Sequence, residues 1–206
     1  RGDLDNRGGQ VIGLNDLEVG AATLDNGQQG LLGSQQSTRV SAQALVNRGD
    51  GEVSGKRVEA RVGSLDNRGG KLIGDDLLVV ASGAIDNRLG LFSAANRLDL
   101  RARSLDNRGG VLVADAGLSA TGGAFDNRDG GSASGKAGVR VEVASLRNDQ
   151  GGKLLSDGRL DLAANAVGNA GGRIAAKGDL QATLGSLAQQ GGELVSEKTL
   201  KVAADT

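Results

Sequence analysis

Short apolar runs separated by glycine- and aspartate-rich turns follow one another along the whole chain. The segment 65–84, for example, begins with Leu-Asp-Asn-Arg-Gly-Gly, continues with the apolar run 71–73, turns at 74–76 and ends with the apolar run 77–81. Runs of this length that are rich in Leu and Val and bounded by Gly and Asp are typical of short β-strands joined by tight turns. No stretch between turns is long enough for an ordinary helix. The pattern therefore predicts an all-β protein.

The pattern is a repeat, because a marker Asn returns at steps of 20 or 21 residues. The marker positions are Asn6, Asn26, Asn47, Asn67, Asn87, Asn107, Asn127, Asn148, Asn169 and, with the longer amide side chain, Gln189. Ten like units at so strict a period indicate a solenoid without a single globular core. We therefore expect residues 1–206 to form one repeat array, a fragment of a longer shaft.

Alignment on the marker shows apolar columns that predict the core. Two residues before the marker stand Leu4, Leu24, Leu45, Leu65, Ile85, Leu105, Phe125, Leu146, Val167 and Leu187. About five residues after the marker lies another column, in which we place Leu31 for the second repeat. Two more columns follow, eleven and thirteen residues after the marker. We place Leu78 and Val80 there in the fourth repeat, and Val40 in the later column of the second.

The step of two between the last columns is the strand period, so both side chains lie on one face. The position between them is mostly charged or small, which indicates a wall with an apolar inside and a polar outside. Stacked units of this kind predict a parallel β-helix of about ten coils, in which each strand pairs with its counterpart one coil on. At ~4.8 Å per coil, the rod is about 48 Å long.

The marker Asn lies two residues beyond an inward Leu, so it should also point inward. A buried amide must be hydrogen-bonded. Because it carries a donor and an acceptor, equal residues on successive coils should bond along the stack. Asn also tolerates the left-handed backbone of a tight bend, and we expect the marker to use it. The neighbouring Asp and Arg, such as Asp66 and Arg68, should face the solvent and bridge within and between coils.

Composition excludes several kinds of chemistry. The sequence has no Cys and no His, so it lacks thiol and imidazole nucleophiles, the common zinc ligands and disulfides. The uniform repeat length leaves no long loop to wall a catalytic cleft, so we assign no catalytic, metal or cofactor site. The 24 basic and 25 acidic residues are interspersed and no basic stripe carries aromatics, which argues against a nucleic-acid partner. Nothing indicates a small-molecule substrate.

The motif Leu-Asp-Asn-Arg-Gly-Gly-x-Leu, followed by Leu-x-Leu-x-Ala at a 20-residue period, resembles the haemagglutinin repeat. That repeat builds the shafts of filamentous haemagglutinins and of contact-dependent growth inhibition effectors of the CdiA type. The resemblance implies a right-handed β-helix in a large exoprotein at the surface of a Gram-negative bacterium. It also implies export by two-partner secretion through an outer-membrane transporter. Leu45-Val46-Asn47, Leu146-Arg147-Asn148 and the corner of Gln189 depart from the motif.

Three functions are open to such an array. The first is a rigid spacer that displays distal binding or toxin domains of an adhesin or inhibition effector. The second is an adhesive module that binds a glycan or a receptor of a host or target cell with one face of the β-helix. The third is a polysaccharide-degrading β-helix enzyme, which the uniform coil length disfavours. The spacer is the leading hypothesis, but the sequence does not choose between it and the adhesive module.

Overall fold

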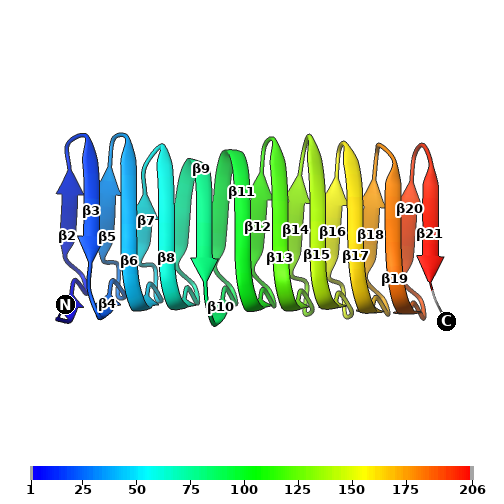
Figure 1. The fold of residues 1–206 in the computed structure, drawn as a ribbon, viewed down its shortest axis with the longest axis horizontal. Coiled ribbons are helices and arrows are strands. Elements are labelled where there is room, and N and C mark those ends of the chain that lie inside the picture. Colours follow the sequence, from blue (N-terminus) through cyan, green and yellow to red (C-terminus); the bar gives the residue numbers. More distant parts are fainter. Residues whose placement is uncertain (1, 205–206) are drawn as a thin grey trace.

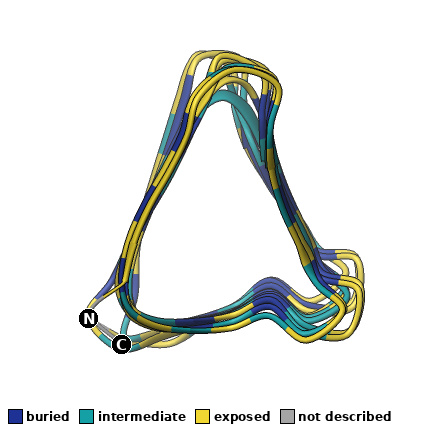
Figure 2. Cartoon of the chain, turned by 90° about the vertical axis from the view of Figure 1, so that its right-hand side faces the viewer, coloured by how far each residue is buried: buried dark blue, intermediate teal, exposed yellow. Residues whose placement is uncertain are grey.

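The computed structural model describes residues 2–204, which form a parallel β-solenoid of about ten coils. The coils are stacked along one axis, with the two ends of the chain at opposite ends of the rod (Figure 1). Viewed along that axis, each coil is a triangle whose sides are β-strands (Figure 2). The chain runs anticlockwise as it advances toward the viewer from N to C, so the solenoid is right-handed, as expected. Each coil is numbered here from 1 to 10 by its marker residue, from Asn6 to Gln189.

The three faces of the triangle differ in the length of their strands. The first face carries the Leu-Asp-Asn motif, the second follows the Arg-Gly-Gly corner, and the third leads back to the first. Strands confined to the second face are β2 (Gln10–Gly13), β5 (Leu31–Ser34), β7 (Glu52–Ser54), β12 (Val111–Ala114), β14 (Ser132–Gly135), β16 (Lys153–Ser156), β18 (Arg173–Ala176) and β20 (Glu193–Ser196).

Most strands of the third face continue around the third corner into the first face. These are β6 (Ser37–Val46), β8 (Arg57–Asp66), β13 (Gly117–Asp126), β15 (Gly138–Arg147), β17 (Arg159–Gly168) and β19 (Leu180–Ala188). Shorter pieces are β1 (Leu4–Asp5), β3 (Asp16–Gly20), β4 (Thr23–Asp25), β10 (Ala84–Asp86) and β21 (Leu200–Ala204). β9 (Lys71–Ala81) joins the second and third faces, and β11 (Leu91–Asp106) passes through all three.

Every strand pairs in parallel with its counterpart one coil away, which places like residues in stacks. On the first face the pairing joins, in order, Leu4, Leu24, Leu45, Leu65, Ile85, Leu105, Phe125, Leu146, Val167 and Leu187. All of these side chains are buried except those of Leu4 and Leu187, in the terminal coils, which are partly exposed. The interior of the triangle is thus an apolar column that runs the length of the rod.

The structure corrects three placements in the other columns. Leu32, not Leu31, pairs with Val11 and is fully buried, because coil 2 holds an extra residue in its first corner. In coil 4, Leu77 and Val79 point inward instead of Leu78 and Val80.

The second corner of coil 4 is shorter than most. Leu77 follows Leu72 by five residues, whereas Leu98 follows Phe92 by six. The third corner of coil 4, around Ser82, is one residue longer. The coil therefore keeps the repeat length of 20, and the shift of its inward positions cannot be seen from that length. Val40 is placed as expected, and Thr38 fills the neighbouring apolar position. Its hydroxyl is satisfied there by donation to the Ser54 carbonyl at 2.7 Å.

Candidate functional site

The marker Asn side chains form one hydrogen-bonded stack along the inside of the first corner, here called the Asn ladder. In each step the Nδ2 of one Asn donates to the Oδ1 of the Asn in the next coil, at 2.7–2.8 Å. The ladder joins Asn6, Asn26, Asn47, Asn67, Asn87, Asn107, Asn127, Asn148 and Asn169. From Asn26 to Asn169 every member is fully buried. All amide dipoles point the same way, which lets the bonds polarise one another.

Each ladder amide also ties its corner to the backbone. Asn107 Nδ2, for example, donates to the carbonyls of Gly110 in its own coil and of Ser132 in the next, at 3.1 and 3.2 Å. Its backbone N–H donates to the Asp126 carbonyl at 2.7 Å. One side chain therefore fixes the end of the first face, the corner and the start of the second face.

Gln189 does not extend the ladder. Asn169 Nδ2 donates to the Glu193 carbonyl at 3.0 Å, and Gln189 Oε1 is buried without a partner among residues 2–204. The extra methylene of Gln displaces its amide from the position that the shorter Asn occupies. The expected ladder therefore ends at Asn169.

The left-handed backbone of the corner does not belong to Asn, contrary to our expectation. It belongs to the second residue after the marker, as at Gly69 (φ 62°) and Gly109 (φ 61°). Corners with one more residue use two such positions, as at Gly49 and Asp50. Asn was therefore selected for its amide and not for its backbone freedom. Leu89 adopts the same conformation (φ 57°) with its side chain 77% exposed, which is unusual for a bulky residue.

The last Gly of the corner is a structural residue that sequence reasoning passed over. It is present in all ten coils as Gly9, Gly30, Gly51, Gly70, Gly90, Gly110, Gly131, Gly152, Gly172 and Gly192. A Cβ at Gly110 would lie 2.1 Å from the carbonyl oxygen of Asn87 and 2.6 Å from the Oδ1 of Asn107. Only glycine lets the backbone pass this close to the ladder, and its invariance across the repeats was the available signal.

Outside the same corner, Asp and Arg side chains form the charged strip that the sequence predicted. In each of coils 4–7 the guanidinium holds the carboxylate two residues before it in a two-point contact, as in Arg68 Nε–Asp66 Oδ1 at 2.8 Å and Nη2–Oδ2 at 2.7 Å. In coils 4–6 the same Arg also reaches the Asp of the next coil at 3.6–3.9 Å. Bridging within and between coils is thereby confirmed.

The strip shifts the titration of its members. The Arg68 hydrogen bond lowers the pKa of Asp66, while the Asp66 carboxylate raises the pKa of Arg68. Burial raises the pKa of Asp126, but the hydrogen bonds from Arg128 outweigh it, so the net direction is down. Asp5 is exposed, and the hydrogen bonds that it accepts from Arg7 lower its pKa to about 2. All these groups are charged at neutral pH, so none is poised for proton transfer.

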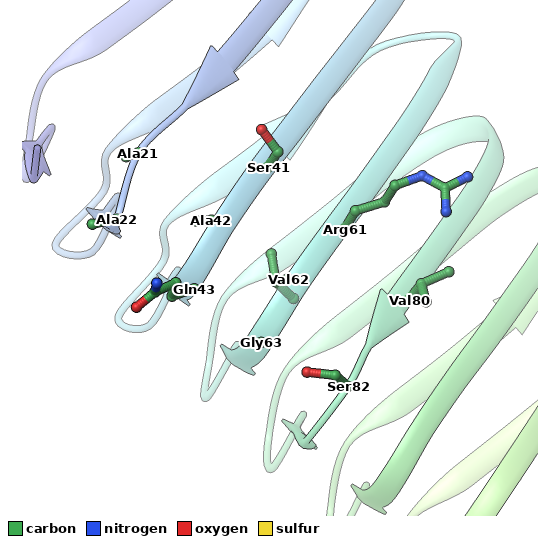
Figure 3. Close-up of a pocket in the computed structure, with 10 residues that line it drawn as sticks. All are labelled: Ala21, Ala22, Ser41, Ala42, Gln43, Arg61, Val62, Gly63, Val80 and Ser82. Carbon is green, nitrogen blue, oxygen red and sulfur yellow. The ribbon is translucent and has the colours of Figure 1, made fainter. Parts of the chain in front are cut away.

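Among residues 2–204 the surface offers open hollows, without an enclosed cleft that groups reactive side chains. One hollow lies over the third corner of the first coils (Figure 3) and is lined mainly by small residues, together with Arg61 and Gln43. A second lies beside the charged strip, between Arg68, Arg88 and Arg108. Residues 2–204 contain no cluster of three acidic side chains that could hold a metal ion. The same residues include no helix that is long and apolar enough to cross a membrane.

The chain matches a known protein family. The sequence profile of the family described as haemagglutinin repeat matches residues 1–88, 93–164 and 139–206. These segments cover nearly the whole chain and span both the ladder and the strip. Neither the curated proteins nor the solved structures gave a match to this chain.

Replacement of the ladder amide should cost far more than replacement of the neighbouring carboxylate. Asn107→Ala leaves amides on both sides and the corner carbonyls without partners, and we expect a loss of ~1–3 kcal/mol in the free energy of unfolding. Asp106→Ala removes two partly exposed ion pairs, with Arg108 and Arg88, each of which contributes at most ~1 kcal/mol. Thermal or denaturant unfolding followed by circular dichroism measures both. Equal losses would contradict a central role for the ladder.

The corner glycine provides a second test within the same coil. Gly110→Ala forces a methyl group onto the Asn87 carbonyl, so we expect a loss of roughly 1–3 kcal/mol or more from overpacking. Gly117→Ala is the matched control, because a Cβ there meets its nearest atom, the Gly138 carbonyl oxygen, only at 4.0 Å and its φ is not left-handed. A control variant as destabilised as Gly110→Ala would show that the close approach is not the cause.

The charged strip should make stability depend on acid. Asp carboxyls titrate near ~3.9 in the unfolded chain, and the folded pKa values of Asp66, Asp126 and Asp5 are lower. The folded state therefore gains stability above that value and loses it as the pH falls from about 4 toward about 2. Melting temperatures between pH 7 and pH 2 measure this loss. An Asp66→Asn, Asp126→Asn variant should show a smaller loss, and an unchanged slope would exclude the strip as its source.

Proposed function

Because this chain belongs to the haemagglutinin repeat family, we propose that it serves as a rigid shaft segment of a large secreted surface protein, an adhesin or a contact-dependent inhibition effector. The family is one of structural, non-enzymatic β-solenoids of adhesin-like proteins. In this role the coils separate distal binding or toxin domains from the cell surface. The observation that carries the proposal is the unbroken ladder, which joins nine successive corners without an inserted loop.

Mechanical stiffness follows from this construction. Each coil is bonded to its neighbours through strands on all three faces, and the Asn ladder adds a fourth line of bonds along an edge of the core. A bend would have to lengthen one of these lines. At ~4.8 Å per coil the array spans roughly 45–48 Å. The length of the rod is set by the number of coils, so additional repeats make a longer spacer.

The composition supports export of the chain in an unfolded state. Without Cys, no disulfide is able to form in an oxidising compartment and block passage through a pore. Coils that contact only their neighbours are able to fold one after another as the chain emerges. We infer passage through a two-partner-secretion transporter in the outer membrane and exposure at the surface of a Gram-negative bacterium. In this arrangement, domains that the shaft presents contact a receptor on the host or target cell.

A deletion of two whole coils tests the spacer. Removal of residues 85–124 joins Ala84 to Phe125 in register and should shorten the rod by ~10 Å, as measured by small-angle X-ray scattering. The circular dichroism spectrum should keep its shape. On glycan arrays and cultured cells, neither the parent chain nor the deletion variant should show saturable binding. Saturable binding that disappears with these two coils would establish an adhesive module instead.

A further inference from the structure

The second face carries an outward column without a single charge, here called the uncharged stripe. The alternation of the strands points these side chains to the outside, and their pairing stacks them along the rod. The members are Ile12, Gly33, Ser54, Ile73, Ser93, Val113, Ser134, Leu155, Ala175 and Val195. By contrast, the corresponding outward column of the third face carries charges such as Glu59 and Asp99.

Polar and charged side chains border most of this stripe, with apolar exceptions at Leu14 and Leu31 near one end and at its centre. On the side of the first corner the next outward column is apolar in coils 5 and 6, where it holds Leu91 and Val111, the latter 40% exposed. Farther out the same column holds Glu52 in coil 3 and Lys153 in coil 8. On the side of the second corner, coils 3 and 4 carry Lys56 and Asp75.

Four of these bordering charges have no partner of their own. The side chains of Glu52, Lys56, Asp75 and Lys153 make no ion pair or hydrogen bond within the described part of the chain. Other charges at the second corner are paired between coils, as in Lys136–Asp115 and Lys177–Asp157, both at 2.8 Å. The centre of the second face is therefore apolar, and its rim offers free charges of both signs.

We propose that two copies of this chain associate through their second faces, antiparallel, about a two-fold axis parallel to the strands between coils 5 and 6. Such an axis reverses the rod but keeps each column opposite the same column of the partner, so coil n meets coil 11 − n. In the middle, Leu91 of each copy then meets Val111 of the other. Across the stripe, Ser54 faces Leu155, Ile73 faces Ser134 and Ser93 faces Val113. In these three pairs a small side chain meets a larger one, whereas toward the ends Gly33 faces Ala175 and Ile12 faces Val195.

The same arrangement pairs the charges. Glu52 meets Lys153 of the second copy, which satisfies two unpartnered groups at once. At the second corner, Lys56 meets Asp157 and Asp75 meets Lys136. No like charges face each other in these columns.

Neighbouring alignments are worse. With coil n opposite coil 12 − n, Lys71 faces Lys153. With coil n opposite coil 13 − n, Glu52 faces Glu193 and Lys71 faces Arg173. The charges therefore favour the first of these three alignments, as complementary rims do in specific interfaces.

The contact area predicts a reversible dimer. The face is four residues wide, at ~3.3 Å per residue, and ten coils long, at ~4.8 Å per coil, which gives roughly 13 Å by 45 Å. Pairing of two such faces buries roughly 1,200 Å² over both copies. This lies at the lower limit for specific protein interfaces, where association is weak in solution. Paired shafts would be stiffer than single ones.

Sedimentation equilibrium of the 206-residue chain, at concentrations up to ~1 mM and in low and high salt, tests the proposal. We expect a monomer–dimer equilibrium that weakens with salt. Lys153→Glu places Glu opposite Glu52 at two symmetry-related points, so it should weaken association by at least ~10-fold. Glu52→Lys should do the same. The double variant Glu52→Lys, Lys153→Glu restores opposite charges and should restore association to near the parent level.

A second exchange and a control complete the test. Asp75→Lys places a cation opposite Lys136 of the second copy and should weaken the dimer. The exchange partner Lys136→Asp should restore association when it is made together with Asp115→Lys, which keeps an ion pair between positions 115 and 136 within the chain. Arg101→Glu, an exposed charge reversal on the third face, should leave association unchanged while circular dichroism verifies the fold of every variant. A chain that stays monomeric at all concentrations would overturn the proposal. So would a dimer that ignores both exchanges, because it would use another face or another alignment.

Discussion

The whole molecule depends on the hydrogen bond between one buried asparagine amide and the next. A triangular coil has corners at which the backbone must leave one sheet and enter another, and the first corner holds the most irregular backbone of the coil. The strand pairing is interrupted there. The side-chain amide of each Asn donates hydrogen bonds to corner carbonyls and to the next Asn, and its oxygen accepts one from the preceding Asn. A buried polar group is costly when unsatisfied, so the ladder stabilises only as a continuous series. That requirement makes the spacing of the repeat strict.

Within this constraint the coils tolerate local changes of length. An additional residue in the first corner of coil 2 is absorbed by a second left-handed residue, since Gln28 and Gln29 both have positive φ. A residue missing from the second corner of coil 4 is returned at the third. In both coils the inward Leu and the Asn keep their places. The corners vary because their tips lie in solvent, whereas the ladder and the apolar columns are closed on every side.

Charge on this rod has two arrangements with different consequences. Around the first corner, Arg and Asp neutralise each other within the coil and between coils, as in Arg108 with Asp106 and Asp126, which removes the repulsion that stacked carboxylates would otherwise create. On the second face the charges stand farther apart, and several remain free. A shaft that is charge-balanced along one edge and carries an uncharged stripe on another face presents different surfaces to its surroundings. That difference is compatible with a spacer whose copies pair antiparallel through one face.

The sequence alone determined the class of fold, the number of coils, the inward Leu column and the charged strip, because each depends on a period that a stack of like units must repeat. The amide ladder was equally accessible, since a polar residue at an inward position requires a partner and its counterpart in the next coil is the nearest one. The tertiary structure decided the features that do not follow from the repeat period. Leu77 and Val79 replace Leu78 and Val80 inside because two compensating changes in corner length leave the repeat at 20 residues. The left-handed conformation falls on Gly69 instead of Asn67, and Gln189 leaves the ladder, because backbone torsion and side-chain reach depend on the neighbouring coil. Only the packed coil shows that Gly110 is required by the close approach of the Asn87 carbonyl.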